Sequence, residues 1–142
     1  DSGRENYPNL LETALINGNY KSLAKNLRKQ NTIRSFEKRI NPLGGVFEYP
    51  VPITAPENLA EGEFQRYYIR ALCRKALEDG YKKLRIITNK PLDAIPDEQK
   101  AKIGRTIKTT DLLNDLRENS YIDSRFGIPA PNTGITVEFI SQ

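Results

Sequence analysis

The chain has 142 residues, which favours a single globular domain with a hydrophobic core of its own. Its net charge of +4 suggests an anionic neighbour only weakly, because basic residues also serve solubility. The sequence has no histidine and one cysteine, so Ser-His-Asp and Cys-His catalysis, an intrachain disulfide and a cysteine-based zinc site are excluded within it.

The first forty residues predict a helical hairpin. Apolar residues recur at helical spacing over residues 10–15 and again over residues 20–29. The second of these segments has a basic side that includes Lys25 and Arg28. The chain opens at Asp1, which we interpret as proteolytic maturation or as a sequence that lacks its first residues. We expect residues 1–40 to form an N-terminal hairpin or arm, followed by a domain over residues 41–142.

Residues 41–56, "NPLGGVFEYPVPITAP", contain four prolines and two adjacent glycines, which exclude a helix. Residues 46–51 predict one short strand, and Pro50 and Pro52 restrict it to a sheet edge or an extended arm. Two interpretations stay open. The segment either lies across the surface of a neighbouring protein or connects two elements over the core of its own domain.

Residues 63–80, "EFQRYYIRALCRKALEDG", predict a long helix that Gly80 ends. One face carries apolar and aromatic residues at helical spacing, and we expect it to be buried. These residues are Phe64, Tyr67, Tyr68, Ala71, Leu72 and Ala76. Cys73, in the middle of this helix and without a histidine partner, is interpreted as a small core residue.

A stripe of arginines lies on another face of the same predicted helix, with Arg66, Arg70 and Arg74 four residues apart. It suits a solvated face, in which Glu78 pairs with Arg74 and Glu63 pairs with Arg66. It also suits a protein partner or a phosphate backbone. The candidate partner or phosphate contacts are Lys25, Arg28, Arg66, Arg70 and Arg74.

The second half of the chain predicts strands over residues 81–88 and 135–140 and a short helix that ends near Arg117. A long polar connection over residues 89–106 contains one helical turn after Pro96. A strand near Val46, the long helix and residues 81–88 would form a right-handed βαβ-like unit if the two strands were parallel. The expected fold class is α+β: a small mixed sheet, made of segments near Val46, Leu84 and Val137, packed on one long helix and preceded by an N-terminal helical hairpin.

Few motifs point to catalysis. Glu98 and Lys100 form an E-x-K pattern beside Asp97, but contiguous residues of a loop cannot place two carboxylates around one Mg²⁺. The glycines lack the spacing of a phosphate-binding loop. We therefore expect no catalytic residue, no metal and no cofactor, with an enzyme that uses carboxylates alone as a minor alternative.

Five segments form a recognisable order along roughly residues 41–139: "NPLGGVF", the long-helix segment, Ile103-Gly104, "LLNDLR" and "GIPAPNTGITVEF". Together they resemble small proteins encoded among the structural genes of tailed bacteriophages. This resemblance implies a virion or assembly component with no catalytic, cofactor-binding or metal-binding residues to carry over.

The leading functional hypothesis is a non-enzymatic structural or assembly protein of a tailed bacteriophage, such as a minor capsid, cementing or head–tail connector component. Its partners would be other virion proteins, present in many copies, with contact to packaged DNA left open. We expect no membrane contact and no small-molecule substrate. The location would be the virion, after synthesis in the bacterial cytoplasm. The alternative is a small basic module that binds nucleic acid through its arginine- and lysine-bearing helices.

Overall fold

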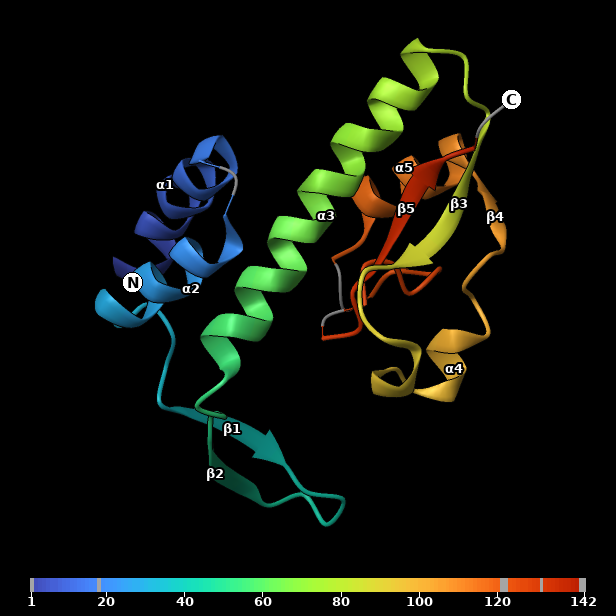
Figure 1. Ribbon diagram of the computed structural model, residues 1–142. Helices are drawn as coiled ribbons and strands as arrows, with labels where there is room; N and C mark the ends of the chain where they lie inside the picture. The colour runs from blue at the N-terminus through green and yellow to red at the C-terminus, as the bar shows by residue number, and fades with distance from the viewer. Residues whose placement is uncertain (1, 18, 121–122, 131, 141–142) are drawn as a thin grey trace. The chain divides into compact units, whose positions relative to one another are not determined.

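The computed structural model describes residues 2–17, 19–120, 123–130 and 132–140 (Figure 1). The chain divides into two compact units, Asp1–Ala60 and Glu61–Gln142. The boundary expected after residue 40 falls inside a β-hairpin of the first unit, so the observed division lies twenty residues further along.

The first unit begins with the expected helical hairpin, α1 (Ser2–Asn17) and α2 (Tyr20–Lys29). Asn19 caps α2, because its side-chain oxygen accepts a hydrogen bond from the Lys21 N–H at 2.8 Å. The two helices bury a small apolar set against each other. Its members are Leu11, Ala14, Leu23, Ala24 and Leu27.

Two strands complete the first unit, β1 (Phe36–Ile40) and β2 (Val46–Pro50), paired antiparallel. The expectation that the segment near Val46 joins the main sheet is therefore wrong. The Asn-Pro-Leu-Gly-Gly sequence between the strands forms a tight turn, so β2 pairs with the segment that directly precedes it.

The second unit holds most of α3 (Ala55–Glu78), followed by β3 (Lys83–Thr88), the 3₁₀ turn η1 (Leu92–Ala94) and α4 (Asp97–Lys100). The chain continues through β4 (Thr106–Lys108), α5 (Thr109–Glu118) and β5 (Ile135–Phe139). The strand order is β4-β3-β5 and every pairing is antiparallel, so the sheet is not the mixed one that was expected. The suggested βαβ unit does not form, because the strand before α3 belongs to the separate hairpin.

The core of the second unit lies between this sheet and the helices α3 and α5. In β3, Leu84 and Ile86 are buried while Lys83 and Arg85 are exposed, the alternation of a sheet covered on one face. The buried set is Ile69, Cys73, Ala76, Leu84, Ile86, Ile107, Leu112, Leu113, Leu116, Ile128, Ile135 and Val137. This arrangement confirms the α+β class and the packing of a small sheet on one long helix.

The buried face of α3 differs from the expected one. Tyr68 is 48% exposed, and the inward positions are Ile69, Cys73 and Ala76, with Leu72 partly buried. The expected face was shifted because both tyrosines were treated as apolar. A tyrosine is amphipathic and can keep its hydroxyl end in water. The interpretation of Cys73 as a core residue is confirmed, and burial raises the pKa of its thiol to about 11.

A buried carboxylate fastens the segment after α5. Asp115 is fully buried and accepts hydrogen bonds from the Asn119 side-chain amide at 2.7 Å, the Ser124 hydroxyl at 2.8 Å and the backbone N–H groups of Arg125 and Phe126 at 3.0 and 3.2 Å. Burial raises the pKa of Asp115, but these hydrogen bonds outweigh it, and the pKa lies below the ordinary value of 3.8. Asp115 is thus a structural anchor.

Candidate functional site: an exposed β-hairpin

The β1–β2 hairpin is built by a short, well-defined turn. The Gly44 N–H donates to the Asn41 carbonyl at 3.0 Å, and the Asn41 side-chain oxygen accepts from the N–H groups of Leu43 and Gly45, both at 2.9 Å. Pro42 occupies the second position of this turn, and Gly44 has a φ of +85°. A turn followed by a left-handed glycine is the usual three-residue hairpin connection.

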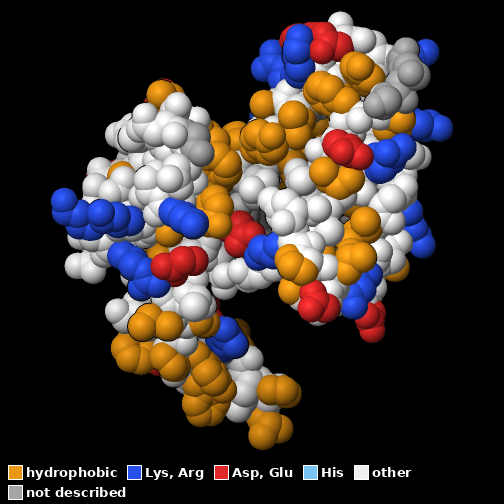
Figure 2. Space-filling view, viewed as in Figure 1, with side chains coloured by type: hydrophobic (Ala, Val, Ile, Leu, Met, Phe, Trp, Pro, Cys, Tyr) orange, Lys and Arg blue, Asp and Glu red, His pale blue; other side chains and the backbone are white. Residues whose placement is uncertain are grey.

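All ten residues of the two strands are exposed, although many are large and apolar. Figure 2 shows hydrophobic side chains gathered at the surface of this hairpin. The exposed apolar residues of the hairpin and its flank are Phe36, Ile40, Leu43, Val46, Phe47, Tyr49 and Ile53. Contiguous exposed apolar surface of this kind typically marks an interaction site.

The register assigns each side chain to a face. Residues opposite each other in an antiparallel pair share a face, so the pairs Phe36–Pro50, Lys38–Glu48 and Ile40–Val46 lie on one side. Two apolar pairs therefore flank a central pair of opposite charges. On the other side, the Arg39 guanidinium lies 5.3 Å from the centre of the Tyr49 ring and pairs with Glu37.

The two edges of the hairpin are not equivalent. The Asn41 N–H bonds the Gly45 carbonyl and the Val51 N–H bonds the Ser35 carbonyl, which fixes the alternation of bonded and non-bonded pairs. Phe36, Lys38 and Ile40 consequently direct their backbone groups outward along the β1 edge. On the β2 edge the corresponding position Pro50 has no N–H, so only β1 offers a full set of donors and acceptors.

The base of the hairpin is fastened by Arg28, one of the predicted contact residues. Its guanidinium makes a bidentate pair with the Glu57 carboxylate, with N···O distances of 2.6 and 2.9 Å, and donates to the Ile53 carbonyl at 2.7 Å. The hydrogen bond from Arg28 holds the pKa of Glu57 below its usual value. Arg28 thereby joins the end of α2 to the start of α3, while Lys25 is exposed on α2.

The arginine stripe of α3 separates into two kinds of residue. Arg66 is largely buried: it donates to the Leu116 carbonyl at 3.1 Å and pairs with Glu63 at 3.2 Å, as the sequence spacing predicted. Arg70 and Arg74 stay accessible, and the Arg70 guanidinium lies 4.9 Å from the centre of the Tyr67 ring.

A shallow groove of about 360 Å³ follows this part of α3. The expected Arg74–Glu78 ion pair is not present among the described residues, and the ion pair that forms here joins Lys75 to Asp79 at 3.0 Å. The groove is lined by Tyr67, Arg70, Ala71, Arg74, Lys75, Glu78 and Arg117. Arg117 was not predicted as a contact residue, because it comes from α5 and reaches the stripe only through the fold.

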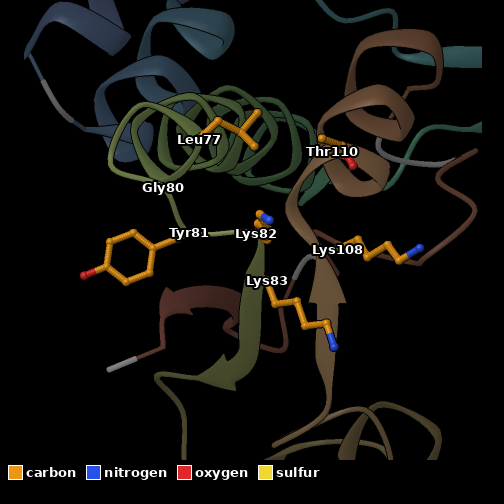
Figure 3. A pocket seen from close by; sticks show the side chains of 7 residues that line it. All are labelled: Leu77, Gly80, Tyr81, Lys82, Lys83, Lys108 and Thr110. Atoms are coloured by element: carbon orange, nitrogen blue, oxygen red, sulfur yellow. The ribbon is translucent and has the colours of Figure 1, made fainter. Parts of the chain in front are cut away.

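A second hollow, of about 550 Å³, lies where α3 ends and β3 begins (Figure 3). Its lining includes Leu77 and Tyr81 together with three lysines, Lys82, Lys83 and Lys108. Figure 3 shows the side chains of Lys83 and Lys108 extending outward rather than converging on a common point. This arrangement does not define a binding site for a single anionic group.

The residues that the structure describes contain no cluster of three or more cysteine, aspartate or glutamate side chains placed to hold a metal ion. None of their helices is both long enough and apolar enough to cross a membrane. Comparison of the chain with models of protein families, with characterised proteins and with solved structures gave no match.

Proposed function

We propose that this chain is a non-enzymatic structural or assembly protein of a tailed-bacteriophage particle, and that it contacts a neighbouring virion protein through the β1–β2 hairpin. The observation that carries the contact is a hairpin whose ten strand residues are all exposed while seven large apolar side chains lie on or beside it. The assignment to a phage particle rests on the resemblance of residues 41–139 to that class of small proteins.

The partner on the β1 edge is an extended segment that adds a third strand. Strand addition supplies main-chain hydrogen bonds, and the side chains on alternate positions supply specificity. Since Lys38 lies between Phe36 and Ile40, the matching segment has an acidic residue between two apolar ones. A second copy of β1 is disfavoured in the symmetric register, because it would place Lys38 opposite Lys38.

A matched pair of proline variants tests this contact. Lys38→Pro removes an outward N–H from the β1 edge, and Glu48→Pro removes the outward N–H directly opposite it on the β2 edge. Neither substitution removes a hydrogen bond between the two strands. We expect Lys38→Pro to abolish co-sedimentation of the protein with purified particles from producing cells, and Glu48→Pro to retain it. Equal incorporation of both variants would contradict strand addition, whereas a wild-type chain absent from particles would contradict the virion role itself.

The nucleic-acid alternative retains part of its expected contact set. Arg28 and Arg66 are engaged in structural contacts, while Lys25, Arg70 and Arg74 stay accessible. Binding to phosphates weakens steeply with salt: the logarithm of the binding constant falls against the logarithm of the salt concentration with a slope of about −0.9 per phosphate contacted. A salt titration with duplex DNA therefore measures this alternative directly. Salt-insensitive incorporation into particles supports the protein–protein contact instead.

A further inference from the structure

The groove on α3 and α5 has an excess of positive charge that the described chain does not neutralise. Four cations line it, Arg70, Arg74, Lys75 and Arg117, against the single acid Glu78. Lys75 is paired with Asp79, whereas no ion pair is found for the three arginines among the described residues. The Tyr67 ring and Ala71 also line the groove.

The same unit carries an exposed acidic segment of the opposite character. Residues 92–99, "LDAIPDEQ", contain three carboxylates, and Lys90 and Lys100 flank them. Asp93 and Glu98 are exposed, and Asp97, 98% exposed, has one partner, Lys100, at 3.2 Å. Beside them Leu92 is 58% exposed, so this segment presents acidic groups together with one apolar side chain.

We infer that the arginine groove binds residues 92–99 of a second copy of this chain. The three guanidiniums without an ion pair in the described part of the chain meet the exposed carboxylates of Asp93 and Glu98, with Asp97 beside them shared with Lys100. Leu92 provides an apolar contact for Tyr67 and Ala71. Pairing within one copy does not occur, since Figure 1 shows α4 and the C-terminal end of α3 at opposite ends of the second unit. This inference stands on a different surface from the hairpin and does not depend on it.

The contact is head-to-tail, because groove against groove and acidic segment against acidic segment would both place like charges together. A head-to-tail interface leaves one groove and one acidic segment free at the ends of every open oligomer. It therefore generates rings if the rotation closes and filaments if it does not. Both outcomes give many-copy assemblies from one kind of chain.

Two charge-reversal variants of the full-length chain test the inference by mixing. One carries Arg70→Glu and Arg74→Glu, and the other carries Asp93→Lys and Glu98→Lys. We expect the wild type to self-associate in sedimentation velocity at low ionic strength, and to dissociate as salt is added. Each variant alone should associate at least about tenfold more weakly, since like charges oppose the contact.

Mixed together, the two variants should associate again. The intact groove of one variant meets the intact acidic segment of the other, and the two reversed surfaces are also opposite in charge. A control with Lys83→Glu and Arg105→Glu changes the net charge as much as the groove variant does, outside the groove, and should self-associate like the wild type. Monomeric behaviour of the mixture would overturn the inference, as would association that persists in both variants.

Duplex DNA separates this contact from nucleic-acid binding. A wild-type chain that stays monomeric but binds DNA through Arg70 and Arg74 would assign the groove to phosphate and overturn the inference. Lys38→Pro, which addresses the hairpin, should leave the head-to-tail contact unchanged. Failure of the hairpin proposal and failure of this inference are thus separate results.

Discussion

The β1–β2 hairpin and the three-stranded sheet of the second unit are both antiparallel, yet they differ in what covers them. In β3, buried and exposed residues alternate, because α3 and α5 cover one face of that sheet. In the hairpin every strand residue is exposed on both faces. Main-chain pairing is satisfied in each, but a lone two-stranded hairpin is marginally stable in water. The comparison indicates that the sheet stabilises the fold of its unit, and the exposure of the hairpin is what supports the proposed contact with another molecule.

The largest loss in the free energy of unfolding should come from a substitution on the covered face of the sheet. Leu84 is fully buried at the centre of the core between β3 and the helices. Leu84→Ala removes buried methyl groups and leaves a cavity, so we expect it to lower the free energy of unfolding by about 2–5 kcal/mol. Urea denaturation of the full chain measures this loss. A loss below about 1 kcal/mol would mean that the sheet is no better covered than the hairpin.

Substitution of Asp115 should give the next largest loss in the free energy of unfolding, because this carboxylate fixes the segment after α5. In Asp115→Asn one carboxylate oxygen becomes an NH₂ group, which faces donors that then lack an acceptor. We expect a loss of about 2–3 kcal/mol in the free energy of unfolding, and little change for the control Asp111→Asn at the start of α5. An equal effect of the two substitutions would contradict the anchoring role.

The lowered pKa of Asp115 predicts how the stability lost in Asp115→Asn depends on pH. Because the pKa of Asp115 is lower in the folded chain than in the unfolded chain, its stabilisation is fully present above the unfolded value of 3.8. It is lost as the pH falls through the folded pKa. The stability difference between wild type and Asp115→Asn should therefore be constant near neutral pH and shrink below pH 3.8. Unfolding curves recorded across the acid range check the sign.

Gly134, at the start of β5, should give a smaller effect that still exceeds any in the hairpin. Its φ is +65°, and a Cβ atom there would meet the Asn89 side-chain oxygen and lie 2.9 Å from Lys90 Cγ. We expect Gly134→Ala to cost about 2 kcal/mol of stability. Gly104 has a similar φ of +83° with no atom near its missing Cβ, so Gly104→Ala should cost about 1 kcal/mol. Equal losses for the two substitutions would show that the close atoms around Gly134 add nothing to the cost of its positive φ.

Local periodicity predicted that the helices and the apolar strands β3 and β5 exist. It did not predict that α3 begins at Ala55, eight residues before the expected start and inside the segment from which a helix was excluded, nor the strand β4, nor how the strands pair. Residues 36–40, "FEKRI", carry three charges in five positions, so their strand character appears only when β2 lies beside them. The inward face of α3 was misplaced because tyrosine is amphipathic, and its rings were counted with the aliphatic residues. Local spacing did identify Arg66, Arg70 and Arg74 as a stripe.

The contacts of several polar side chains involve partners that are distant in the sequence. Arg66 is held by a carbonyl fifty residues away, and Arg117 enters the groove from another helix. The role of Asp115 likewise depends on donors up to eleven residues further along the chain. Spacing alone contains no information on such contacts, because they are set by how the helices and loops pack.

The smallest loss in the free energy of unfolding should come from a substitution in the hairpin. This substitution is also the sharpest test of the difference between the hairpin and the covered sheet. Phe47 is 48% exposed, so Phe47→Ala removes only part of the burial that a core phenylalanine has, and truncation of a core phenylalanine would cost about 3–5 kcal/mol. We expect the free energy of unfolding to change by less than about 1 kcal/mol, measured by urea denaturation beside Leu84→Ala. A loss above about 2 kcal/mol would mean that the hairpin is covered by its own chain in solution. Unchanged stability combined with reduced incorporation into particles would instead mean that the phenylalanine is retained for a neighbour, since the fold itself does not need it.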